Sequence, residues 1–317
     1  MRIRVKAAAF IFFLSLSSLV LLPAQSVKLV RTINFLDSAK QKKSLKTFIF
    51  GRKKRKAVKP CAICRVNAEF ICVTDSVNGA VLLIDKQGKI KKRITRVKGI
   101  NFLAPVSACI DDRGSLYVAD SAQGGVIRFN SNFRFEEVFI ASLDRRITAI
   151  SFAQGHFYCV DTQNHQVLCF DRLGQLKFSF GKRGISEGEF NFPTHIATDK
   201  KHIYITDAMN FRVQVFDFNG RFIRVFGSHG RGGGNFAKPK GIAVDSKGHI
   251  FAADAMFDNV QIFDKNGEFL YFFGGPGQQE NRFWMPSGIM VDHDDTIWVA
   301  DTYNHRLQIF RLVEETI

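Results

Sequence analysis

The stretch DTYNHRLQIF at residues 301–310 recurs with small changes at residues 207–216, where the chain reads DAMNFRVQVF. The same frame, an aspartate followed six residues later by an apolar run, fits four further places. The six anchoring aspartates are Asp75, Asp120, Asp161, Asp207, Asp254 and Asp301, at intervals of 41 to 47 residues. A fixed period of this length is typical of a repeat protein in which each copy forms one structural unit.

Each copy predicts four short strands. In the copy anchored at Asp254, apolar runs cover residues 242–245 and 250–254 before the turn, and residues 260–263 and 269–273 after it. The first three runs lack polar alternation, which indicates strands buried on both faces. Four-stranded sheets of this kind, repeated around an axis, form a propeller. The sequence therefore predicts an all-β, six-bladed β-propeller of four-stranded antiparallel blades.

The last copy has only three strands, because seven residues follow Phe310 and cannot form a fourth. A segment from the N-terminus must complete this blade, and both Leu29–Phe35 and Lys46–Phe50 are candidates. We favour Leu29–Phe35, which leaves Ser38–Phe50 as a short basic helix or loop. Either choice joins the two chain ends in one blade and removes open sheet edges.

The repeated pattern P-x-G-I-x-V-D, I-x-x-A-D, N-x-R-x-Q-x-F-D and F-G resembles the NHL repeat. It is nearly complete at Pro239–Gly274 and Pro286–Phe310 and clear at Pro193–Gly227, whereas the three earlier copies lose its Arg and Gln. The resemblance covers roughly residues 60–311 and implies a six-bladed propeller of the exported bacterial NHL-repeat type. It implies no single activity, because this fold hosts unrelated functions.

The first 26 residues look like a targeting segment. Arg2, Arg4 and Lys6 precede the uncharged run Ala7–Leu22, and Pro23 with small residues around Gln25 follows. This order is typical of a secretory signal peptide; the alternative is an uncleaved anchor, for which sixteen apolar residues are short. We expect an exported protein, periplasmic or extracellular, organised as signal segment 1–26, closing strand and basic connection 27–59, and propeller 60–317.

The basic charge is concentrated near the N-terminus. The formal net charge is +16, yet residues 27–98 hold 20 basic and 4 acidic side chains, and residues 99–317 hold 22 and 25. A nucleic-acid groove usually needs basic residues spread over its surface, so this distribution argues against nucleic acid as the main partner. The densest run is Arg52, Lys53, Lys54, Arg55 and Lys56. We interpret it as a solvated loop or as a contact with an anionic membrane surface or envelope polymer.

Six cysteines accompany the expected export, so disulfides are worth testing. Cys61 and Cys64 form a C-x-x-C motif, but Arg65 excludes the haem-attachment pattern. The repeat register places every cysteine except Cys61 on a strand, where other copies carry Val, Ile, Ala or Tyr. We therefore expect these five to act as small core side chains.

The turns that begin at Asp161, Asp207 and Asp301 repeat the motif D-x-x-N. Asp301 and Arg306 flank one such turn and are expected to pair across the two strands, which, with Asn304, would fix the hairpin. The tips of these hairpins and the first residues of the innermost strands share one face of a propeller, the usual ligand surface in this architecture. The candidate ligand-binding residues on this face are His165, His195, Asn210, Phe211, Asn304 and His305.

His195 replaces the glycine found at Gly241 and Gly288, which places one imidazole near the central channel. A catalytic metal site needs several converging ligands, and the equivalent positions carry small residues. We therefore expect no catalytic residue, metal or cofactor. The predicted function is a monomeric, non-catalytic binding or scaffold propeller that presents a loop face to a protein or cell-envelope component. The alternative is a metal-dependent propeller lyase or hydrolase with its site at the central channel.

Overall fold

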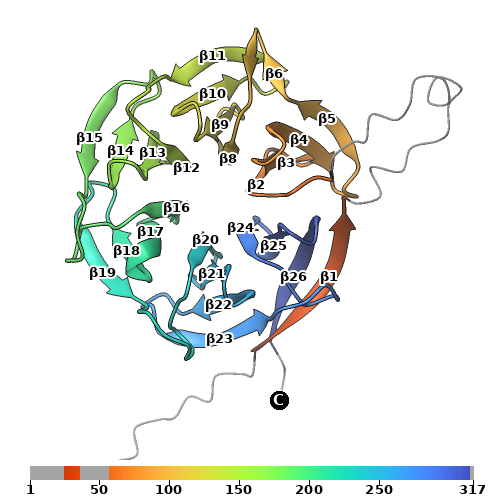
Figure 1. Ribbon diagram of the computed structural model, residues 1–317, viewed down its shortest axis with the longest axis vertical. Helices are drawn as coiled ribbons and strands as arrows, with labels where there is room; N and C mark the ends of the chain where they lie inside the picture. Colours follow the sequence, from red (N-terminus) through yellow and green to blue (C-terminus); the bar gives the residue numbers. More distant parts are fainter. Residues whose placement is uncertain (1–24, 36–56, 315–317) are drawn as a thin grey trace, which may run out of the picture.

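The computed structural model describes residues 25–35 and 57–314, which form six four-stranded antiparallel sheets around a central axis (Figure 1). The strands run outward in chain order in blades 1 to 5, so the first strand of each blade lines the axis. This arrangement confirms the predicted all-β, six-bladed propeller.

The strand bounds follow the repeat. Blade 1 consists of β2 (Ile63–Arg65), β3 (Phe70–Asp75), β4 (Ala80–Asp85) and β5 (Ile90–Ile94). Blade 2 consists of β8 (Pro105–Ile110), β9 (Leu116–Asp120), β10 (Gly125–Phe129) and β11 (Phe135–Ile140), and blade 3 of β12 (Ile147–Ala153), β13 (His156–Asp161), β14 (Gln166–Phe170) and β15 (Leu176–Phe180). Blade 4 consists of β16 (Pro193–Thr198), β17 (Ile203–Asp207), β18 (Arg212–Phe216) and β19 (Phe222–Phe226), and blade 5 of β20 (Pro239–Val244), β21 (Ile250–Asp254), β22 (Asn259–Phe263) and β23 (Phe269–Gly274). Blade 6 consists of β24 (Pro286–Val291), β25 (Thr296–Asp301), β26 (Arg306–Glu314) and the N-terminal strand β1 (Gln25–Asn34).

Strand β1 closes the ring, as predicted. It pairs antiparallel with β26 from Gln25 opposite Glu314 to Asn34 opposite Arg306. The strand is longer than expected and begins two residues before the boundary assigned to the signal segment. Ile33 and Phe35 are buried with residues of blades 6 and 1, so the closure is also a packing contact. The alternative segment Lys46–Phe50 and the expected helix or loop Ser38–Phe50 lie outside the described residues.

Phenylalanines fill the spaces between blades. The fifth residue of the third strand is a buried phenylalanine in five of the six blades, at Phe129, Phe170, Phe216, Phe263 and Phe310. In the core between blades 4 and 5, Phe263 packs against Phe226 and Phe236 with ring centroids 4.8 and 5.7 Å apart. Large rings suit these wedge-shaped spaces because each one buries a large apolar surface.

Glycine-rich segments join one blade to the next. Gly274 has φ +100°, and a Cβ atom there would lie 2.5 Å from the ring of buried Phe283. Gly181 and Gly227 stand in the same relation to Phe190 and Phe236. Only glycine fits these positions without displacing the ring. The connection between blades 1 and 2 differs, because it forms a small hairpin of β6 (Arg96–Val97) and β7 (Ile100–Asn101), which the sequence did not predict.

All six cysteines are free in the structure. Cys64, Cys72, Cys109, Cys159 and Cys169 lie on strands, four of them fully buried, whereas Cys61 precedes β2. This confirms the interpretation of the five strand cysteines as core side chains. Within the part of the chain that the structure describes, no helix has the length and apolar content to cross a membrane.

Candidate functional site

The propeller has two different faces. In blades 2 to 6 the first residue of the innermost strand pairs with the anchoring aspartate, as Pro193 does with Asp207 and Pro286 with Asp301. The turns after the anchors and the linkers into the innermost strands therefore lie on one face, which we call the hairpin face. The opposite face holds the turns between the first and second and between the third and fourth strands, and we call it the turn face.

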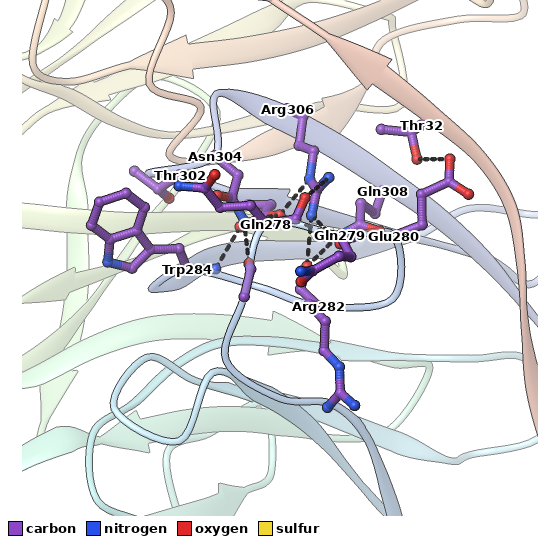
Figure 2. A network of polar contacts seen from close by, with 12 residues as sticks. Thr32, Gln278, Gln279, Glu280, Arg282, Trp284, Thr302, Asn304, Arg306 and Gln308 are labelled. Carbon is purple, nitrogen blue, oxygen red and sulfur yellow. Dashed lines mark hydrogen bonds and ion pairs between the residues drawn. The ribbon is translucent and has the colours of Figure 1, made fainter.

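The anchoring aspartate of blade 6 organises a buried polar network on the hairpin face (Figure 2). Asp301 is fully buried, and its carboxylate accepts hydrogen bonds from Arg306 Nε at 2.7 Å and Gln308 Nε2 at 3.1 Å. Asn304 Nδ2 adds a bond of 2.9 Å, and the backbone N–H of Trp284 one of 2.8 Å. These contacts confirm that Asp301 and Arg306 pair across the hairpin.

Arg306 also fixes the linker that enters blade 6. Its two terminal nitrogens donate to the backbone oxygens of Gln278, Gln279 and Arg282 at 2.7 to 2.8 Å. All nitrogens of the guanidinium are thus used inside the protein, with the charge offset by Asp301. Blade 4 repeats the arrangement, since Asp207 accepts from Arg212 Nε at 2.8 Å. In blades 4 and 6, the D-x-x-N…R motif therefore holds the hairpin against the linker that enters the blade.

The candidate residues in the hairpins have such internal partners. Asn210 and Asn304 each donate to the anchoring aspartate and to a linker carbonyl, of Gly184 and Gly277 respectively. His305 Nδ1 lies 2.8 Å from the carbonyl oxygen of Val58. These contacts position the loops of the hairpin face, and a direct contact of these three side chains with a ligand stays a prediction.

His165, Phe211 and His305 occupy the same position in three hairpins, and all three have φ between 54° and 56°. His165 Nδ1 accepts a hydrogen bond from the backbone N–H of Phe192 at 3.1 Å, and the two rings pack edge to face. Phe211 packs on His229 with ring centroids 4.5 Å apart. Their ligand-binding role also stays a prediction.

His195 lies apart from these hairpin residues, on the innermost strand β16. The strand register aligns it with Ala62, Ser107, Ala149, Gly241 and Gly288, as the sequence predicted. Its Nδ1 lies 3.0 Å from Thr194 Oγ1. Burial, together with the nearby Lys240 ammonium, lowers the pKa of His195 to about 3. The imidazole is therefore neutral at physiological pH.

Lys240 is a functional candidate that the sequence reasoning missed. It is the second residue of the innermost strand β20, where the other blades carry Cys61, Val106, Thr148, Thr194 and Ser287. Burial is the main cause that lowers the pKa of Lys240, and the charge of Lys238 adds to it. The described residues offer its ammonium group no hydrogen bond or ion pair. Aligning the six copies by their repeat register would have shown Lys240 as the one charged residue at a position that is otherwise small or uncharged.

Exposed apolar side chains gather on the hairpin face. The described residues expose sixteen large apolar side chains, and nine of them lie in its hairpins and linkers: Val77, Leu103, Leu143, Ile185, Phe192, Met209, Met256, Trp284 and Tyr303. The turn face has one, Leu173, and the others lie on outer strands or on the extension of β26. Trp284 and Tyr303 pack together with ring centroids 5.6 Å apart, and Lys59 Nζ lies 4.5 Å above the Tyr303 ring.

Among the described residues, side chains that could bind a metal ion do not converge where the central channel opens on the hairpin face. Among the described residues, the one group of three close ligand atoms is Asp292, His293 and Asp294, which lies on the turn face. Asp292 is already engaged, because Arg65 pairs with it at 3.1 Å and Trp298 Nε1 donates to it at 3.2 Å. The arrangement therefore fits a structural turn better than a metal centre.

The turn-face end of the channel opens into a cavity of about 540 Å³. Its walls include Ile63, Ile150, Ile196 and Met290 from four innermost strands. The basic run Arg52–Lys56 lies outside the described residues, so its contact with anionic surfaces stays a prediction.

The comparisons with known proteins agree with this architecture. Residues 196–258 match the family described as 6-bladed beta-propeller, and residues 283–310 match the NHL repeat. No curated protein matches the sequence. A protein of unknown function from Bacteroides thetaiotaomicron has a similar structure, with TM-score 0.67, 15% identity, and 92% of this chain and 76% of that chain covered.

Two enzymes also have this fold. One is a gluconolactonase from Xanthomonas campestris, with TM-score 0.62, 14% identity, and 81% of this chain and 87% of that chain covered. The other is virginiamycin B lyase from Staphylococcus aureus, solved as an inactive variant with quinupristin, with TM-score 0.59, 14% identity, and 92% and 100% covered. Identities this low show the fold alone. The strand topology and these matches show that the chain has the six-bladed β-propeller fold and contains an NHL repeat at residues 283–310.

Proposed function

We propose that this chain is an exported, non-catalytic binding propeller whose hairpin face docks a protein partner. The observation that carries the proposal is the concentration of exposed apolar side chains on that face, nine against one on the turn face. Apolar groups gathered on one face of a soluble protein mark interaction sites, and aromatic and Met side chains are enriched where partners bind. Trp284, Tyr303 and Met256 supply such groups.

The charges of this face favour a partner that carries carboxylates. Lys59, Lys238 and Lys240 lie at the start of the innermost strands of blades 1 and 5, and no described carboxylate pairs with any of them. Unpaired charges of one sign at an interface favour a partner of the opposite sign. The fitting partner is a protein segment with acidic and apolar side chains, an envelope protein if the chain is exported.

A propeller lyase or hydrolase is the competing function, because two of the similar structures are enzymes of those kinds. At the channel mouth, however, the described residues supply one neutral imidazole, one thiol and one ammonium group, without a third metal ligand beside them. Metal analysis of the purified full-length protein separates the two functions. A tightly held, stoichiometric metal ion would support the enzyme and contradict the binding propeller.

Capture by matched variants tests the docking face. We would immobilise the wild type, the double variant Trp284→Ser/Tyr303→Ser, and Phe272→Ser, whose side chain is 56% exposed on the outer strand β23. The proposal predicts one cell-envelope protein that the wild type and Phe272→Ser retain and the double variant loses. Its purified form should bind the wild type and Phe272→Ser with equal affinity and the double variant at least 10-fold more weakly. Equal binding to all three would contradict the proposal.

A further inference from the structure

The mouth of the central channel on the hairpin face brings together side chains from four blades. Thr194 and His195 come from β16, Lys240 from β20, Ser287 from β24, and Cys61 from the residue pair before β2. Cys61 Sγ lies 3.7 Å from Ser287 Oγ and 3.8 Å from the carbonyl oxygen of Val106. We call these five residues the channel mouth.

Lys240 is the charged residue of the channel mouth. It lies on β20, between the innermost strands β16 and β24 of the neighbouring blades, and occupies the same strand position as Thr194 and Ser287. Its positive charge contributes to the lowered pKa of His195. Its own backbone is fixed, because Thr206 Oγ1 donates to the Lys240 carbonyl oxygen at 2.8 Å. Lys240 is thus held at a fixed position of the innermost strand.

The polar groups around Lys240 carry no negative charge that would offset its own. His195 is neutral, Lys238 is a second cation, and the hydroxyls of Thr194 and Ser287 are polar and small. A largely buried ammonium group without a counter-ion is costly, because it has lost part of its hydration without gaining a partner. An anion that entered the mouth would offset this cost.

We propose that the channel mouth is a binding site for one carboxylate group, held by the Lys240 ammonium as counter-ion and by the Thr194 and Ser287 hydroxyls. A single buried ammonium balances the one charge of a carboxylate, whereas a phosphate dianion would leave negative charge uncompensated. The carboxylate belongs either to a small organic acid or to the end of a peptide chain. The site does not require the protein partner proposed above, since either source would reach it from the open hairpin face.

Carboxylate affinity should fall as the pH rises. A bound carboxylate favours the charged form of Lys240, while burial and Lys238 favour the neutral amine. Because the pKa of Lys240 is already below its ordinary value, the ammonium loses its proton at a lower pH than an exposed lysine. The other titratable groups that act on the ammonium are His195, Cys61 and Lys238, and its pKa of about 3 keeps His195 neutral at physiological pH.

The test uses the full-length protein, the variants Lys240→Met and Lys240→Gln, and the control Lys238→Met. We would measure thermal unfolding at constant ionic strength with increasing butyrate, with chloride as the control anion. A peptide with a free C-terminal carboxylate and its amidated form make up a second pair of probes. Reductive methylation followed by mass spectrometry would report whether each carboxylate protects Lys240.

We expect butyrate, the free-carboxylate peptide, or both to stabilise the wild type and Lys238→Met saturably. At a 100-fold excess over Kd, the folding equilibrium constant should rise about 100-fold. Both Lys240 variants should lose this response, and Lys240→Met should be at least as stable as the wild type without ligand. Stabilisation by butyrate but not by the peptide would identify the ligand as a small organic acid. Stabilisation by the free-carboxylate peptide would identify it as the end of a peptide chain. An equal response of the wild type and both Lys240 variants, or no difference from chloride and the amidated peptide, would overturn the proposal. The capture experiment above would be unaffected by that failure.

Discussion

Replacing Phe35 with alanine should reveal how much of the ring's stability depends on the N-terminal strand. Phe35 follows β1 directly, is 1% exposed, and lies in the buried cluster that also holds Ile33, Ile71 and Trp298. Removing a fully buried phenylalanine ring costs about 3–5 kcal/mol, from lost burial and from the cavity that remains. That is a large part of the roughly 5–15 kcal/mol by which most domains are stable.

The expected change is large enough to measure by circular dichroism. In a chain of this size, 1 kcal/mol shifts the midpoint of thermal unfolding by about 2 °C, so Phe35→Ala should lower Tm by about 6–10 °C. The matched control is Val30→Ala, on the same strand but 56% exposed, for which a surface change predicts a shift of about 1 °C. Urea unfolding should give the same order of stabilities.

Deletion of residues 27–36 is the stronger form of the same test. It would leave β26 as an open edge, and an unpaired edge strand favours pairing with a second molecule. The truncated protein should unfold or dimerise, as sedimentation would show. Equal Tm values for Phe35→Ala and Val30→Ala, together with a truncated protein that stays monomeric and equally stable, would refute closure by β1.

Four further predictions concern separate parts of the molecule. Asp301→Asn should lower the free energy of unfolding by about 3–5 kcal/mol, because it leaves the buried Arg306 guanidinium without a counter-ion. Asp75 has no arginine partner among the described residues, so Asp75→Asn should lower the free energy of unfolding clearly less in the same urea titration. The hydrogen bond of His249 Nδ1 with Asp245 at 2.7 Å raises the pKa of His249. The stability that this bond contributes is therefore complete below about pH 6.5 and is lost as the pH rises through the raised pKa. His249→Gln should remove this loss from the pH profile of Tm. Iodoacetamide at pH 8 should alkylate Cys61 before the other cysteines, since burial raises the pKa of Cys64 to about 12 and of Cys169 to about 11, and mass spectrometry that found Cys64 modified first would contradict this. Replacement of Arg52, Lys53, Lys54, Arg55 and Lys56 by Ser or Gln should leave folding intact. If the run binds anionic surfaces, the replacement should also weaken the salt-sensitive sedimentation of the protein with anionic vesicles. Vesicle binding that changes with neither the substitution nor the salt would show that the run is a solvated loop.

The fold could be predicted because the same pattern of four strands occurs in six copies along the sequence. Each anchoring aspartate fixes the register of its copy, so the four strands, the closing strand and the pairing of Asp301 with Arg306 all follow from one pattern. The hairpin of β6 and β7 did not follow, because the linker between blades 1 and 2 departs from the repeat.

The candidate site was harder to predict, for a physical reason. The residues that recur in the hairpins, such as Asn304 and His305, recur because they hold the loops, and the structure shows their hydrogen bonds to backbone groups. Lys240 and the exposed Trp284 occur in one copy each, so a search for recurring residues passes over them, although the register does mark Lys240 as an exception. Their importance depends on which side chains surround them or leave them exposed, which only the assembled ring determines.

Hydrogen–deuterium exchange on the wild type with its captured partner tests whether the propeller binds through its hairpin face. We expect slowed exchange in the hairpins and linkers of that face, at residues 181–192, 208–211, 274–285 and 302–305. We expect unchanged exchange in the turns of the opposite face, at residues 199–202, 245–249 and 292–295. Protection confined to the turn face, with the hairpin face unchanged, would contradict the proposal that this propeller binds through its hairpin face.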